Sequence, residues 1–218
     1  MSKEYAGSTV RLILIPGLIT LGVTILRLVG ELQDWPEPFF SRDAGGGLAI
    51  VGISWLPVIF GIYFAWKLVK SGVGPTSLGK AFGYTALALV VLVAGLVLFG
   101  LSQFRGPMLA LGCLLIAASA LVPLLGWPAL TKTLIAYGYA ARIPVVIIMF
   151  FALRDKWGTH YDGPPPNFPE MGFLSKYFVL GVLPQLIGWI AFTVIVGMLF
   201  GSIAASVAGR RASEVPAA

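Results

Sequence analysis

Six apolar stretches occupy most of this 218-residue chain, and their length restricts the folds open to it. They cover approximately residues 9–30, 48–69, 80–102, 107–126, 129–153 and 177–204. A helix needs about 20 mostly apolar residues, at a rise of about 1.5 Å each, to cross the hydrocarbon core of a bilayer. Because unpaired backbone amides are costly in lipid, a crossing segment must be a helix that satisfies its own hydrogen bonds. The pattern predicts an all-α, polytopic membrane bundle of six transmembrane helices.

The composition indicates the same class. Hydrophobic residues make up 58% of the chain and charged residues 11%, whereas about 25% is usual for charged residues in soluble domains. The apolar stretches are so closely spaced that residues 1–218 are predicted to form a single integral membrane domain. The scarcity of asparagine suits a GC-rich bacterial genome, and we expect the chain to lie in a bacterial inner membrane.

The basic residues are scattered at the ends of the stretches, although the net charge is +6. This distribution argues against nucleic acid as a partner, which would need one basic face. The anionic headgroups of the lipid bilayer are the expected counter-charge.

Six crossings place both termini on one side of the membrane. If that side is the cytoplasm, it receives eight basic residues, Lys3, Arg11, Lys67, Lys70, Lys80, Lys132, Arg210 and Arg211. The opposite side receives six, Arg27, Arg42, Arg105, Arg154, Lys156 and Lys176. Since cytoplasmic loops carry an excess of Lys and Arg, we expect both termini to be cytoplasmic. The connections 31–47 and 154–176 then become two exterior loops that cap the bundle.

Arg142 is the most informative polar residue. It is the fourteenth residue of the stretch 129–153, close to the middle of the membrane, where arginine costs about 2.5–3.5 kcal/mol to insert. Such residues usually face the interior of a bundle or a wet cavity. Tyr139, three residues earlier, is expected on the same face of the helix, and Gln185 is a further polar candidate for the same ligand site.

Three interpretations of Arg142 stay open, because no acidic residue lies deep in any stretch. A ligand or lipid neutralises the guanidinium, or the side chain is a structural tie that bonds carbonyls, Gln185 and threonine hydroxyls. In the third interpretation, the first half of the stretch lies partly at the membrane interface. Three prolines, Pro57, Pro144 and Pro184, are expected to kink their helices and to shape a cavity.

The exterior loops carry acidic residues and the only histidine, His160. Carboxylates with one imidazole suit a divalent cation, and His160 with Asp162 are the candidate metal ligands. No spacing matches a metal motif, so the alternative is that these charges simply face water.

Four small residues in the last stretch are each four positions apart: Gly197, Gly201, Ala205 and Gly209. This spacing lets helix backbones approach closely. The seam serves either packing inside the bundle or a contact with a second copy of the chain.

Two functions remain open. The favoured one is a permease-like helical bundle that binds or moves a small anion or a lipid, with Arg142 as the charge contact. The alternative is a non-catalytic accessory or assembly subunit of a larger membrane complex, docked to a membrane-protein partner through the seam and the aromatic outer loops. An enzyme ranks third, because the sequence contains no catalytic motif, and no cofactor is expected.

Overall fold

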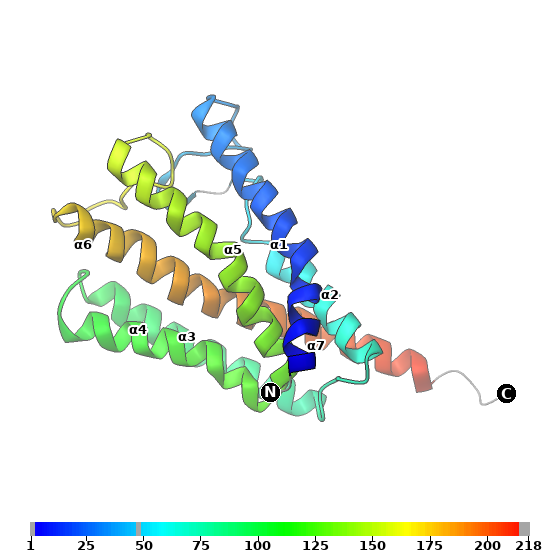
Figure 1. Cartoon of the computed structure of the whole chain (residues 1–218). Helices are drawn as coiled ribbons and strands as arrows, with labels where there is room; N and C mark the ends of the chain where they lie inside the picture. Colours follow the sequence, from blue (N-terminus) through cyan, green and yellow to red (C-terminus); the bar gives the residue numbers. More distant parts are fainter. Residues whose placement is uncertain (1–2, 47–48, 214–218) are drawn as a thin grey trace.

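The computed structural model describes residues 3–46 and 49–213, and it describes the side chains of residues 9–45 and 49–208. All regular structure in this described part is helical (Figure 1). The helices are α1 (Lys3–Leu32), η1 (Ala44–Gly46), α2 (Leu56–Lys70), α3 (Leu78–Leu101), α4 (Gly106–Leu121), η2 (Val122–Leu125), α5 (Pro128–Asp155), α6 (Phe173–Tyr177), η3 (Phe178–Val182), η4 (Pro184–Gly188) and α7 (Trp189–Ser213).

Among the residues that the structure describes, five helical segments are long and apolar enough to cross a membrane. They are Thr9–Leu32, Leu78–Leu101, Gly106–Leu125, Pro128–Asp155 and Phe173–Ala208. The predicted all-helical class is therefore confirmed, and five of the six apolar stretches are long helices close to their predicted bounds.

The stretch predicted as the second span, 48–69, is helical only in part. Helix α2 begins at Leu56 and has 15 residues, about 22 Å at 1.5 Å per residue, which is short of a core of about 30 Å. The residues before it are held in an irregular conformation by backbone hydrogen bonds from Ile50 and Val51 to the preceding loop. The expected kink at Pro57 is wrong, since this proline lies in the first turn of α2, where its missing N–H breaks no helical bond.

The other two prolines lie inside helical segments and behave differently. Helix α5 continues through Pro144 from Pro128 to Asp155. At Pro184, which cannot donate to the carbonyl four residues earlier, the helix widens into the π-helical turn η4, closed by a hydrogen bond from the Trp189 amide to the Pro184 carbonyl. A second π-helical turn, η3, precedes it, so residues 173–213 form one long helix with a widened middle.

The small-residue seam of α7 faces α2 and α5 of the same chain. A Cβ added to Gly61 of α2 would lie 2.6 Å from the Cα of Gly197, and one added to Gly201 would lie 2.7 Å from a methyl of Leu130. Ala205 is buried, and Gly209 lies outside the residues whose side-chain surroundings are described. Helices α2 and α7 of the same chain therefore approach each other closely along the seam.

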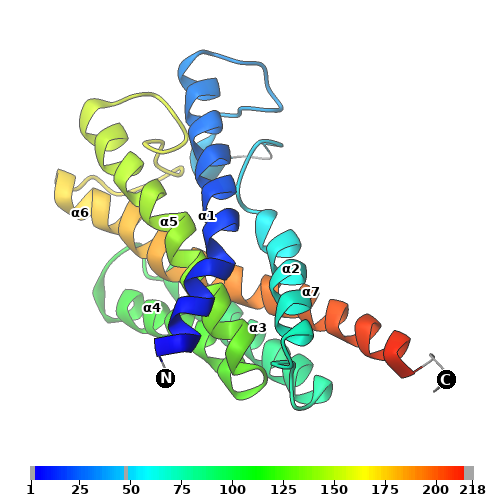
Figure 2. The ribbon, with the colours of Figure 1, turned by 45° about the vertical axis from the view of Figure 1, so that its right-hand side comes forward.

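The described parts of the two long connections, residues 33–46 with 49–55 and residues 156–172, lie together at one end of the bundle (Figures 1 and 2). The start of α1 and the end of α7 both lie toward the lower end in the two views. Helix α1 and the α6–α7 segment both pack against α5 beneath the two loops, and the candidate site lies there.

Candidate functional site

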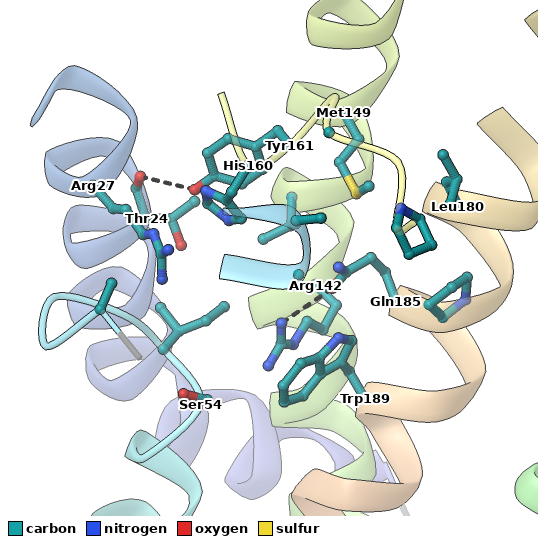
Figure 3. Close-up of a pocket in the computed structure, with 18 of the residues that line it drawn as sticks. Thr24, Arg27, Ser54, Arg142, Met149, His160, Tyr161, Leu180, Gln185 and Trp189 are labelled. Carbon is teal, nitrogen blue, oxygen red and sulfur yellow. Dashed lines mark hydrogen bonds between the residues drawn. The ribbon is translucent and has the colours of Figure 1, made fainter. Parts of the chain in front are cut away.

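A cavity of about 450 Å³ lies between α1, α5 and the widened part of the α6–α7 segment, beneath the two long loops (Figure 3). Its charged and strongly polar side chains are Arg27, Arg142, His160 and Gln185. Apolar side chains such as Val145, Met149 and Leu180 line much of the remaining wall. The cavity therefore combines cationic groups with an apolar body, as ligand sites commonly do.

Arg142 lies in the wall of this cavity and is only 5% exposed. It stands near the middle of α5, about 20 Å from either end of the helix. Its Nη1 donates a hydrogen bond of 3.1 Å to Oε1 of Gln185, and its Cζ lies 4.2 Å from the centre of the Trp189 ring. The Nε atom is buried without a hydrogen-bond partner, and no ion pair involves Arg142 among the described residues.

The π-helical turn at Pro184 positions the partners of Arg142. Gln185 and Trp189 are four residues apart and therefore lie on the same face of the helix, which here turns toward α5. Widened turns of this kind occur frequently at functional sites. Gln185 was predicted from the sequence as a residue of this site, but Trp189 was missed. Trp189 follows the candidate glutamine by four residues, and helical spacing places residues four apart on the same face.

Tyr139 does not line the cavity, contrary to the sequence-based expectation. Its side chain is 40% exposed on the outside of α5, while Arg142 points inward. Residues three apart on an α-helix differ by about 60° in direction, which is enough to place one inside and the other outside. The tyrosine of the site is Tyr161, which comes from the second loop, is buried, and donates a 3.4 Å hydrogen bond to the Thr24 carbonyl.

A second polar cluster lies at the end of the cavity nearest the two long loops. The carboxylate of Glu31, at the end of α1, is fully buried and accepts hydrogen bonds from Arg27 Nε at 2.8 Å and from the His160 amide at 2.9 Å. The His160 ring contacts the same carboxylate through Nδ1 at 2.5 Å, and Arg42 Nε donates to the Glu31 carbonyl at 2.8 Å. These contacts join both long loops to α1.

The ionisation of the loop residues follows from their burial. Burial lowers the pKa of His160 below its ordinary value of 6.5, and the nearby Arg27 charge lowers it further, while the Glu31 carboxylate partly offsets both effects. Burial also raises the pKa of the Tyr161 hydroxyl. The lowered pKa favours the uncharged ring, whose Nδ1 can donate a hydrogen bond to the Glu31 carboxylate.

The expected metal ligands are not arranged around a common point. The carboxylate of Asp162 accepts hydrogen bonds from the Gly158 amide at 3.0 Å and from the Thr159 amide and hydroxyl at 2.7 and 2.8 Å. In the part of the chain that the structure describes, no three His, Cys, Asp or Glu side chains gather to hold a metal ion. Asp162 thus closes its own turn, and the metal hypothesis gains no support.

No family model, curated protein or solved structure matches this chain. Its function is therefore inferred from the chemistry of the cavity. A guanidinium presents five N–H donors in a planar fork that fits a carboxylate or phosphate, and Gln185 takes only one of them by a direct bond. The arrangement suits the binding of one anionic group beside Trp189.

Proposed function

We propose that this chain is a multi-pass protein of a bacterial inner membrane, with six crossings and both termini in the cytoplasm. Helix α2, together with residues 49–55, returns the chain to the end of the bundle where α1 begins, and this supports a second crossing. The positions of the start of α1 and the end of α7, and the excess of basic residues on their side, support the orientation. Reporter tags at the two termini that respond from opposite compartments would contradict it.

We further propose that the bundle is a permease-like binding protein whose cavity holds a small anion or the anionic headgroup of a lipid. The observation that carries the proposal is the buried guanidinium of Arg142, which faces a cavity and has no carboxylate partner in the described part of the chain. A buried charge without a counter-charge is unfavourable, and a bound anion relieves that cost. Gln185 and Trp189 hold the guanidinium at the cavity wall.

The two long loops give this site its cover. Ala44, Gly45 and His160 belong to these loops and also line the cavity. The cluster around Glu31 fixes both loops at the outer end of α1. A solute that enters from the exterior must therefore pass this cover, whereas a lipid can approach from the side.

The test compares anion binding by the purified full-length protein and by Arg142→Gln. We expect inorganic phosphate or acetate to bind the wild type at least tenfold more tightly than the variant, measured by calorimetry in a neutral detergent. Arg154→Gln is the matched control, since Arg154 lies on the same helix but is exposed and paired with Asp155. Arg142→Lys, which keeps the charge but loses the fork, is expected to bind at an intermediate level.

Two outcomes would contradict the proposal. One is equal anion binding by the wild type and Arg142→Gln. The other is a collapse of folded yield in both Arg142 variants with no effect of anions on wild-type stability, which would identify Arg142 as a structural tie to Gln185.

A second candidate is the accessory subunit of a larger membrane complex. It is favoured by the first long loop, where Trp35 and Phe39 are 41% and 48% exposed. Aromatic side chains of this kind are enriched at protein interfaces. Stable co-purification with a membrane-protein partner in mild detergent, lost in a Trp35→Ser, Phe39→Ser variant, would support this role, and a lone monomer would contradict it.

A further inference from the structure

A second hollow, of about 300 Å³, lies between α3, α4 and the segment that runs from η4 into α7. Its walls include Leu92, Leu96, Cys113, Ile116, Ile187 and Phe192. No charged side chain lines it, and apart from the thiol of Cys113 and the indole of Trp189 its described lining side chains are apolar. We call it the apolar groove. Its walls suit hydrocarbon, because a polar group placed there would lack partners.

The apolar groove adjoins the Arg142 cavity. Phe99, Pro184 and Trp189 line both spaces. The Trp189 ring stands beside the Arg142 guanidinium in the cavity and also forms part of the groove wall (Figure 3). A cationic site and a hydrocarbon site are thus separated by only a few shared side chains.

The apolar groove is open at the surface of the bundle beside α3 and α4. Leu96 of α3, in its wall, is 49% exposed. Both helices are long and apolar enough to cross a membrane, so in the proposed topology this face contacts lipid tails. A molecule in the bilayer can therefore enter the groove without passing through water.

We propose that the ligand of this protein is a membrane lipid with an anionic headgroup, an inference that rests on the function proposed above. The headgroup pairs with Arg142 in the cavity, and one acyl chain lies in the apolar groove beside Trp189. A free anion would occupy the cavity alone and would leave the groove empty. A lipid can occupy both spaces, since it joins a phosphate, which a guanidinium binds well, to a long apolar chain.

The experiment uses the full-length protein in a neutral detergent and three probes. Phosphatidylglycerol and phosphatidylcholine with identical acyl chains are compared by native mass spectrometry, and glycerol phosphate, a headgroup without chains, is titrated by calorimetry. We expect at least a tenfold preference for phosphatidylglycerol over phosphatidylcholine, abolished by Arg142→Gln. Glycerol phosphate should bind at least tenfold more weakly than phosphatidylglycerol, because only the lipid has a chain that packs against the walls of the groove.

A substitution in the apolar groove separates the chain from the headgroup. Cys113→Phe fills part of the groove and should lower phosphatidylglycerol binding at least tenfold, while the binding of glycerol phosphate stays unchanged. Leu114→Phe is the matched control, because Leu114 is the next residue of α4 but is exposed and does not line the groove. If Cys113→Phe does not fold, alkylation of Cys113 by N-ethylmaleimide in the wild type gives the same information, since the chain has no other cysteine. Phosphatidylglycerol should slow this alkylation and glycerol phosphate should not.

The outcomes distinguish this inference from the function on which it rests. If glycerol phosphate binds as tightly as phosphatidylglycerol, the binding of both depends on Arg142, and Cys113→Phe changes the binding of neither, the lipid inference is wrong and the anion site stands. If Arg142→Gln changes the binding of neither probe, the anion site itself is wrong.

Discussion

The cavity contains two buried charged regions that the protein treats differently. At its outer end, Arg27 is compensated within the chain by Glu31, which also receives two hydrogen bonds from His160. At its deeper end, Arg142 contacts a neutral amide and an aromatic ring, and no carboxylate pairs with it in the part of the chain that the structure describes. The first arrangement is complete without a ligand and ties loops to helices, whereas the second leaves a positive charge for something else to neutralise. Buried charge is thus common to both regions, and the proposed anion site differs from the cluster in having no counter-charge among the described residues.

The largest expected effect is on the completed cluster. Glu31→Gln removes the negative charge that compensates Arg27 and should lower the free energy of unfolding by about 3–5 kcal/mol, as when one member of a buried ion pair is deleted. Thermal unfolding of the purified protein in detergent measures this loss. Asp34→Asn is the control, because the Asp34–Arg42 pair is largely exposed and should contribute at most about 1 kcal/mol. Equal effects of the two variants would mean that the buried Glu31 carboxylate stabilises the protein no more than the exposed Asp34 does.

In the proposed anion site, the aromatic partner of Arg142 should contribute to the binding of an anion. Trp189→Leu removes the ring that faces the guanidinium and should weaken anion binding by about 1 kcal/mol, or roughly fivefold. Trp189→Phe, which keeps a ring, should lose less. Titration of the two variants with inorganic phosphate checks the order, and a larger loss in the phenylalanine variant would show that the indole acts in another way.

The cluster also predicts a dependence of stability on pH. The pKa of His160 is lowered in the folded protein. As the pH falls below about 6.5, His160 therefore binds a proton in the unfolded chain before it does so in the folded protein. The contribution of this residue is therefore fully present above about pH 6.5 and is lost as the pH falls through the lowered pKa, with a slope of at most about 1.4 kcal/mol per pH unit. Unfolding measured between pH 7.5 and 5 should show this decline in the wild type, and a smaller one in His160→Gln. An unchanged slope in the variant would assign the effect to other groups.

The smallest expected effect is on the stability of the ligand-free protein when Arg142 is replaced. Arg142→Gln removes a buried charge that has no counter-charge in the described structure, so the free energy of unfolding without anions should change by less than about 1 kcal/mol. The same thermal unfolding assay measures it. A loss comparable to that of Glu31→Gln would mean that both regions are structural and that the contrast between them is wrong.

Much of this site was accessible from the sequence, and the missing parts share a cause. Arg142 and Gln185 are polar residues within apolar stretches, so they could be singled out without knowing the fold. Tyr139 was expected in the site and Trp189 was not, because a helix in lipid is apolar on its outer face as well as its inner one. The periodicity that identifies the buried face of a helix in a soluble protein is then weak.

The loops were harder to interpret for a different reason. Glu31 and His160 are 129 positions apart, and only the packing of α1 against α5 brings them within hydrogen-bond distance. The shortened α2 likewise depends on hydrogen bonds between its preceding segment and the first loop, a contact that hydropathy does not report.

The amino-acid sequence by itself determined that the chain is helical and apolar enough for a membrane, because hydrocarbon leaves the backbone no other way to satisfy its hydrogen bonds. It also determined that a charge lies within one of these helices. Only the tertiary structure decided which side chains face that charge and that an apolar groove adjoins it. Those relations depend on the rotation and depth of each helix against its neighbours, which are set by close contacts such as that of Gly61 with Gly197.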